Sequence, residues 1–260
     1  MTAVPIVLRA PPWRPPPEAL VLTRDEVHVW RATLDQPIFR SEGLLRTLAA
    51  DERIRAERFH FAKDREHFIV ARGVLRAILG GYLNRAPDGL SFCYGAHGKP
   101  GLAGGTDVDT IRFSVSHAHG AALYAVARGR EVGIDLERVR SDLPVVELAE
   151  RFFARSEAAR IRSLPTTAQP EAFFRSWTRK EAYIKALGGG LSIPLDRFDV
   201  TQAAGEPGPV LAMQRDPSRG STWLVRELPA ASGYVAALAV EGDGWRPSFW
   251  QWQDPGPKMV

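Results

Sequence analysis

The chain of 260 residues has a single cysteine, Cys93, and no long apolar run. One cysteine excludes an intramolecular disulfide and is typical of a protein kept in a reducing compartment. Its setting predicts a packed position in a strand. No segment approaches the ~20 apolar residues that cross a bilayer, and no apolar core with a small-residue cleavage site opens the chain. We therefore expect a cytoplasmic protein that does not enter a membrane.

Hydrophobic residues make up 45% of the chain, and seven Trp and 12 Phe argue against disorder. The formal net charge is +4, and many basic residues fall between positions 53 and 76, where acidic residues are interspersed. Such a stretch is either a solvated helix face or a surface that binds a polyanion. Arg72 lies in the apolar run 68–75, where a guanidinium needs an anionic partner.

Two stretches resemble each other at a spacing of about 105 residues: EVHVWRA from Glu26 and EVGIDLE from Glu131. Both precede predicted helices and a Leu-Gly-Gly sequence, at 79–81 and 187–189. We expect an α+β fold in which two similar α/β subdomains form an intramolecular pseudo-dimer. The predicted boundaries are a Pro-rich tail at 1–18, subdomains at 19–128 and 129–245, and a C-terminal tail at 246–260.

Acidic side chains recur in the second of these subdomains. In the predicted strand 132–137 the alternation sends Asp135 and Glu137 to one side. A predicted helix that ends near residue 187 carries Glu181 and Lys185 beside its apolar stripe. If the two surfaces meet, three carboxylates converge, and carboxylate oxygens are the ligands that Mg²⁺ prefers. Lys180 would stand beside this predicted metal site.

A β-hairpin is predicted over 113–126, with Ser116 and His117 where its first strand ends. A ring nitrogen of His117 can donate to an anion there. Lys99, in a loop with Gly98 and Pro100, can reach a phosphate. Neighbouring side chains on a strand point apart, so Ser116 and His117 do not form a nucleophile–base pair. The sequence therefore contains no convincing catalytic triad of its own.

In chain order, GKP at 98–100, SVSH at 114–117, GIDLE at 133–137 and WTRKEAYIKA at 177–186 resemble the 4'-phosphopantetheinyl transferase family. The similarity spans roughly residues 26–240 and is greatest to the longer, single-chain, surfactin-synthetase-activating type. Members move the phosphopantetheine arm of coenzyme A onto a serine of an apo acyl-, peptidyl- or aryl-carrier protein and release 3',5'-adenosine bisphosphate. The resemblance implies holo-[acyl-carrier-protein] synthase activity in a monomer that depends on Mg²⁺.

The resemblance also implies roles for individual residues. Mg²⁺ would be held by Asp135, Glu137 and Glu181, with Asp135 also counted as catalytic. Glu181 would accept the proton of the carrier serine, directly or through water, and Lys185 would neutralise or protonate the departing phosphate. The residues predicted to bind coenzyme A are Arg53, Arg55, Arg72, Lys99, Ser116, His117, Lys180 and Lys185. The carrier protein would contact Leu143 and Val145.

Two other functions are compatible with parts of the pattern. A metal-dependent phosphohydrolase acting on coenzyme A or nucleotides would use the same carboxylates but activate water. A nucleic-acid-binding module could use the basic first half, although it leaves the acidic cluster unexplained. We expect no nucleic acid partner for this reason.

Overall fold

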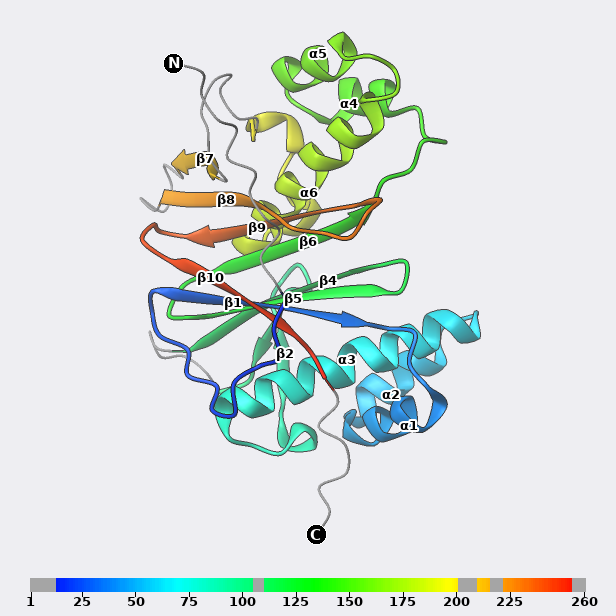
Figure 1. Cartoon of the computed structure of the whole chain (residues 1–260), viewed down its shortest axis with the longest axis vertical. Helices are drawn as coiled ribbons and strands as arrows, with labels where there is room; N and C mark the ends of the chain where they lie inside the picture. The colour runs from blue at the N-terminus through cyan, green and yellow to red at the C-terminus, as the bar shows by residue number, and fades with distance from the viewer. Residues whose placement is uncertain (1–12, 105–109, 201–209, 216–221, 254–260) are drawn as a thin grey trace.

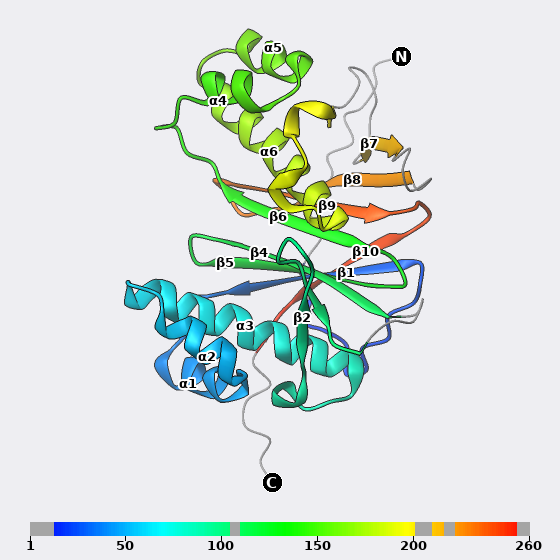
Figure 2. The ribbon, with the colours of Figure 1, turned by 180° about the vertical axis from the view of Figure 1, so that it is seen from behind.

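Two four-stranded sheets lie against each other between two groups of helices (Figure 1). The computed structural model describes residues 13–104, 110–200, 210–215 and 222–253. Each sheet carries its own helices on its outer face, as the view from behind also shows (Figure 2). The predicted α+β fold with two similar halves is confirmed. In the described ranges no helix is both long and apolar enough to cross a membrane.

The first half contains β1 (Glu26–Thr33), α1 (Ile38–Thr47), α2 (Ala50–Glu57), α3 (Ala62–Leu83), β2 (Phe92–Tyr94), β3 (Pro100–Leu102), β4 (Ile111–Ala118) and β5 (Ala121–Arg128). The second half contains β6 (Val132–Arg138), α4 (Val145–Phe152), α5 (Arg155–Ser163), α6 (Gln169–Leu187), β7 (Val210–Arg215), β8 (Thr222–Leu228) and β9 (Tyr234–Glu241). The last strand is β10 (Arg246–Gln251). Short 3₁₀ turns occupy Pro87–Gly89, Gly190–Ser192 and Leu195–Arg197.

The strand orders are β10-β1-β5-β4 in the first sheet and β6-β9-β8-β7 in the second. The predicted hairpin is β4 and β5, and its turn contains His119 and Gly120 with positive φ values of 45° and 83°. The apolar strand β9 is central, paired antiparallel with β6 and β8. It is buried on both faces, which explains why its sequence hardly alternates.

Alternate residues of β6 face two different surroundings, the apolar layer between the sheets and the helix α6. Ile134 and Leu136 are buried in the apolar layer between the two sheets. Gly133 packs directly on α6, and Asp135, which alternates with Ile134 and Leu136, shares its side of the strand. The strand therefore separates the inter-sheet core from the helix that carries Glu181.

Two sequence-based expectations need correction. Residues 246–251 are not part of a tail: they form β10, which pairs in parallel with β1 and places Phe249 opposite Val29. Trp13 also packs edge-on against Phe249, so the start of the described chain joins the same sheet edge. Residues 1–12 and 254–260 of the predicted tails lie outside the described residues.

Cys93 lies in β2 as expected, but it is exposed.

Candidate active site between the two halves

A buried carboxylate marks the contact between the two halves of the chain. Asp135 on β6 is 3% exposed, and its Oδ1 accepts hydrogen bonds from Ser116 Oγ on β4 (2.9 Å) and Lys185 Nζ on α6 (2.6 Å). Lys185 Nζ also donates to Ser116 Oγ at 3.1 Å. Three residues predicted from distant motifs therefore touch one another.

Two further carboxylates lie close to Asp135. Burial raises the pKa of Glu137 to about 7, and the charges of Asp135 and Glu181 act in the same direction, against Lys185. Burial also raises the pKa of Glu181, to which the charge of Asp135 adds, while Lys185 opposes the shift. Asp135 thus acts electrostatically on both glutamates, and Glu181 acts on Glu137. Their joint binding of a metal ion stays a prediction.

The donor set suits a hard divalent cation. Among the described residues no three acidic, His or Cys side chains already stand at metal-binding geometry, and Lys185 pairs with Asp135. Asp135 Oδ2, however, is buried without a hydrogen-bond partner, and like charges raise the pKa of both glutamates. A buried carboxylate oxygen without a partner, next to carboxylates that repel one another, would be stabilised by a bound Mg²⁺. Asp135, Glu137 and Glu181 are the residues that would hold it.

The raised pKa of Glu137 predicts how Mg²⁺ binding depends on pH. Its folded pKa of about 7 lies above the reference value of 4.5, so the metal-free protein loses stability as the pH rises through this window. Mg²⁺ must displace the proton, so its apparent affinity should fall about tenfold per pH unit below 7. Thermal unfolding with and without Mg²⁺ measures both effects.

Glu137→Gln should flatten this dependence, because the amide does not titrate in the range. A stabilisation by Mg²⁺ that is equally large at about pH 6 and about pH 8 would contradict the assigned protonation of Glu137.

Gly133 allows α6 to approach the acidic strand. A Cβ atom on Gly133 would lie 2.0 Å from the carbonyl oxygen of Ala182 and 2.4 Å from the backbone nitrogen of Ala186. Both contacts are with backbone, which cannot rotate away. Any side chain at Gly133 therefore pushes α6, with Glu181, off β6.

Gly133→Ala should consequently destabilise the fold by about 1–3 kcal/mol and abolish catalysis in whatever protein remains folded. Denaturant unfolding and activity measure the two losses. Gly43→Ala in α1 is the matched control, since a Cβ there meets nothing within 4 Å. Equal stability for the two variants would show that the close approach of α6 is not needed.

Positive groups from both halves gather around His117. Burial lowers the pKa of His117, and the charges of Lys185, His67 and Arg55 add to the shift. The lowered pKa favours the neutral imidazole, and Arg55 of α2 and Lys185 of α6 contribute positive charge nearby. A field of this sign beside the carboxylates favours a ligand that carries several negative charges.

A cavity of about 280 Å³ lies at the junction of the two halves. The first half contributes His97, Gly98, Lys99, Pro100, Phe113, Ser114 and Val115 to its lining, and the second half contributes Glu181, Ile184, Lys185, Gly188 and Gly190. Lys99 does not hang free: its Nζ donates to Glu131 Oε2 (2.6 Å) and to the carbonyl oxygen of Ala186 (2.7 Å). Residues 95–100, which contain Lys99 and are called the lysine loop below, thus form part of the cavity wall.

A second depression, of about 680 Å³, lies over α2 and is lined by Asp51, Ile54, Arg55, Arg58, Phe59 and Tyr94. The guanidinium of Arg55 also covers the ring of Phe68 at 5.3 Å. Arg53 is not among these lining residues, because its guanidinium donates to the carbonyl oxygens of Leu48 and Arg46, each at 3.0 Å. Arg55 is therefore better placed than Arg53 to meet an anionic ligand.

The anionic partner that Arg72 requires is inside the protein. Arg72 is 8% exposed, and its Nε lies 3.0 Å from Glu52 Oε1. It also donates to the hydroxyl of Tyr94 and covers the ring of Phe92. Glu52 also contacts Arg76 Nε at 2.7 Å, so one carboxylate serves two guanidinium groups, and the predicted contact of Arg72 with coenzyme A stays a prediction. Burial of Arg72 in an apolar run predicts an anionic partner, and Glu52 supplies one.

The predicted contact of Lys180 with the pyrophosphate is not compatible with its position. Its side chain is completely buried, and its Nζ contacts Glu157 Oε2 (2.7 Å) and the carbonyl oxygens of Leu195 and Phe198. Burial lowers the pKa of Lys180, and the charge of Glu157 opposes this shift. A lysine with no exposed surface cannot clamp a pyrophosphate. It joins α6 to α5 and to the segment after α6.

The two residues predicted to contact the carrier differ in their exposure. Val145 is 5% exposed and belongs to the core of the second half, so it is not available to a partner. Leu143 is half-buried and packs against the same core. Its predicted contact with a carrier stays a prediction.

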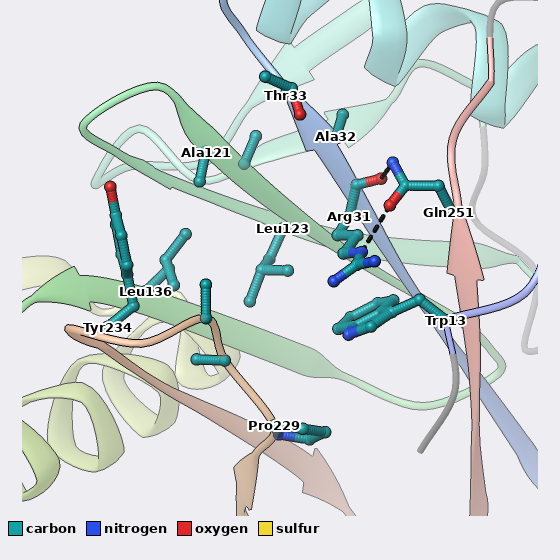
Figure 3. Close-up of a pocket in the computed structure, with 13 residues that line it drawn as sticks. Trp13, Arg31, Ala32, Thr33, Ala121, Leu123, Leu136, Pro229, Tyr234 and Gln251 are labelled. Atoms are coloured by element: carbon teal, nitrogen blue, oxygen red, sulfur yellow. Dashed lines mark hydrogen bonds between the residues drawn. The ribbon is translucent and has the colours of Figure 1, made fainter. Parts of the chain in front are cut away.

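A separate cavity of about 250 Å³ opens where Trp13, Arg31, Leu123 and Tyr234 surround the end of the inter-sheet layer (Figure 3). Leu136 reaches it from β6, on the strand face opposite Asp135. Within the described ranges its lining includes no carboxylate. It is therefore distinct from the acidic site.

Three residues that the sequence did not reveal hold predicted residues or neighbouring strands in place. Ser114 Oγ accepts a hydrogen bond from the backbone nitrogen of Ile134 at 3.1 Å and so joins β4 to β6. Glu131 holds Lys99, and Glu157 holds Lys180. Glu131 had one available signal, its place directly before the acidic strand. Glu157 had none, since its partner is 23 residues away on another helix.

Comparison with known proteins gives consistent matches. The profile described as the 4'-phosphopantetheinyl transferase superfamily matches residues 131–239, and the profile described as 4'-phosphopantetheinyl transferase, N-terminal, matches residues 28–129. The chain is 42% identical over 240 residues to 4'-phosphopantetheinyl transferase HetI of Nostoc sp., covering 92% of this chain and 98% of that protein.

Two further relatives match over shorter stretches. A putative 4'-phosphopantetheinyl transferase, slr0495, of Synechocystis sp. is 33% identical, with 63% of this chain and 65% of that protein covered. The 4'-phosphopantetheinyl transferase Sfp of Bacillus subtilis is 26% identical, with 64% and 73% covered.

Proposed function

Because the chain belongs to the 4'-phosphopantetheinyl transferase superfamily, we propose that the acidic site between its halves transfers the phosphopantetheine arm of coenzyme A to a serine of an apo carrier protein. The observation that carries the proposal is the contact of Asp135 with Lys185 and Ser116 beside the raised-pKa Glu181. Neither hydrolysis nor nucleic acid binding is supported by the relatives, which are named as phosphopantetheinyl transferases.

In the proposed reaction the serine oxygen bonds to the phosphorus that carries the pantetheine arm, and the bridging oxygen of the pyrophosphate departs with 3',5'-adenosine bisphosphate. When bound, Mg²⁺ would supply Lewis-acid stabilisation of the phosphate oxygens. Asp135, Glu137 and Glu181 would hold it.

Glu181 is suited to accept the serine proton. Burial and the charge of Asp135 raise its pKa, and a raised pKa makes a carboxylate a stronger base near neutral pH. It lines the cavity of about 280 Å³ together with Lys185, so an incoming hydroxyl can reach it. The proton moves to a carboxylate oxygen as the serine oxygen attacks.

Lys185 is suited to stabilise the leaving phosphate. Its side chain is 32% exposed although its Nζ touches Asp135, and it lies in the last turn of α6, which ends at Gly188 with φ 71°. Asp135 and Ser116 fix the position of the ammonium group. From there it can neutralise, or donate a proton to, the departing oxygen.

Lys185→Ala should therefore lower kcat by about 100-fold while changing coenzyme A affinity much less. Steady-state kinetics and calorimetric titration of coenzyme A separate the two. Lys63→Ala, which removes a lysine that is 72% exposed, serves as control. A loss confined to affinity would remove Lys185 from the leaving-group role.

The remaining assignments are also proposals. Coenzyme A would lie along Arg55, Lys99, Ser116, His117 and Lys185. Arg55, Lys99 and Lys185 line the two cavities, Ser116 contacts Lys185, and the charges of Arg55 and Lys185 act on His117. We further propose a monomer that works in the cytoplasm, dependent on Mg²⁺.

Intact mass spectrometry of an apo carrier, incubated with the protein, coenzyme A and Mg²⁺, tests the function. The carrier should gain the mass of one phosphopantetheine arm. Release of the bisphosphate with no change in carrier mass would instead identify a hydrolase.

A further inference from the structure

The side chain of Lys99 links the lysine loop of the first half to the second half. Lys99 Nζ donates to Glu131 Oε2 at 2.6 Å and to the carbonyl oxygen of Ala186 at 2.7 Å. Ala186 lies in the last turn of α6, where exposed carbonyl groups give a helix its negative end. An ammonium group is stabilised there, and Glu131 adds a full negative charge beside it.

Packing around this contact limits where the loop can lie. A Cβ atom on Gly188 would come within 3.2 Å of Lys99 Cδ, and one on Gly190 within 3.0 Å of His97 Cβ. The loop residues therefore rest directly on the segment that ends α6. Within the loop, Gly95 donates to the carbonyl oxygen of Lys99 and Gly98 to that of Gly95, each at 2.9 Å.

Glu131 is itself held in place from two directions. Its Oε1 lies 3.3 Å from Arg112 Nε on β4, and its Oε2 meets Lys99. Its side chain is 28% exposed and that of Lys99 is 22% exposed, so solvent screens the pair only in part. One carboxylate thus joins β4, the lysine loop and the start of β6.

We propose that Glu131 is a positioning residue of the transferase: it holds Lys99 across the junction and thereby sets the lysine loop against α6 before coenzyme A binds. This inference rests on the proposed function and assigns a role to a residue outside the four sequence motifs. Glu131 acts through Lys99 and touches no reacting atom.

The sign of the effect follows from the charges. Without the carboxylate, Lys99 loses a charged partner at 2.6 Å and keeps the neutral carbonyl contact from Ala186, while Arg112 nearby remains positive. The loop should then leave α6 part of the time, which opens one wall of the cavity bordered by Glu181 and Lys185. If Glu131 merely competed with a ligand phosphate for Lys99, its removal would instead tighten coenzyme A binding.

Two measurements on Glu131→Gln test the proposal. Hydrogen exchange, followed by mass spectrometry without coenzyme A, should show faster exchange confined to residues 95–100. The KM for coenzyme A should rise about tenfold with kcat changed less than about twofold. Glu241→Gln is the control, because Glu241 accepts a hydrogen bond from the backbone nitrogen of Glu131 at 3.3 Å and so meets Glu131 away from the carboxylate that holds Lys99.

A double-mutant cycle covers the case in which one variant folds poorly. Lys99→Met and Glu131→Gln should not be additive: the double variant should bind coenzyme A no more weakly than Lys99→Met alone. Additive losses, unchanged exchange at 95–100, or tighter binding by Glu131→Gln would each overturn the proposal. The exchange result stands even if wild-type protein fails to modify a carrier, so failure of the proposed function is distinguishable.

Discussion

Glu181→Gln should abolish carrier modification, with a loss of at least about 1,000-fold in kcat, while the protein stays folded. The amide keeps the shape of the side chain but can neither accept the serine proton nor supply a negative charge to Mg²⁺. Glu181 is half-buried on α6 and forms no ion pair within the described residues. The substitution should therefore change the free energy of unfolding little. Single-turnover transfer to an apo carrier measures the loss.

Glu171→Gln is the matched control for this prediction. Glu171 lies on the same helix, is exposed, and pairs with Arg175 at 2.7 Å. It should retain wild-type activity with a stability change of about 0.2–0.5 kcal/mol. A folded Glu181→Gln protein with full activity would exclude Glu181 both as base and as an essential metal ligand.

Lys180→Met should destabilise the protein by about 3–5 kcal/mol, because it leaves the carboxylate of Glu157 buried without its cation. Both side chains are 0% exposed, so the carboxylate lies away from bulk solvent. The same change should leave coenzyme A affinity of the folded protein unaltered, since Lys180 cannot reach a ligand. Denaturant unfolding and calorimetry give the two values.

The double variant Lys180→Met with Glu157→Leu separates charge burial from packing. It should recover most of the lost stability, because no unpaired charge remains. If Lys180→Met folded as well as wild type but lost affinity for coenzyme A, our structural assignment of Lys180 would be wrong.

The acidic strand was predictable because its chemistry follows a short-range rule. Period-two alternation alone placed Asp135 and Glu137 on one side of β6, away from Ile134 and Leu136. The helix was equally clear, since Gly188 ends it with a positive φ. Strand and helix meet as expected because Gly133 leaves room for the backbone of α6.

The choice between the two lysines of α6 could not be made from the sequence. Lys180 and Lys185 are about 140° apart around the helix axis, since each residue adds about 100°, so they face different surroundings. Which one reaches the site depends on Glu157, a partner on another helix. Arg72 illustrates the same limit, because its partner Glu52 becomes a neighbour only when α2 packs on α3. Long-range pairing decides both cases.

Strand β10 shows a further limit. The repeat predicts a tail here, because residues 246–251 follow its second unit. In the structure they return to the first sheet and add a parallel strand beside β1. The repeat predicts two units but not which unit a terminal strand joins, because that depends on an unpaired sheet edge.

The central claim is that carboxylates brought together from β6 and α6 bind one divalent cation. Titration of the protein with Mn²⁺, followed by electron paramagnetic resonance of the free ion, tests it directly. Wild-type protein should bind one Mn²⁺ in competition with Mg²⁺, and both Asp135→Asn and Glu181→Gln should lose at least about tenfold in affinity. Undiminished Mn²⁺ binding by both folded variants would contradict the account.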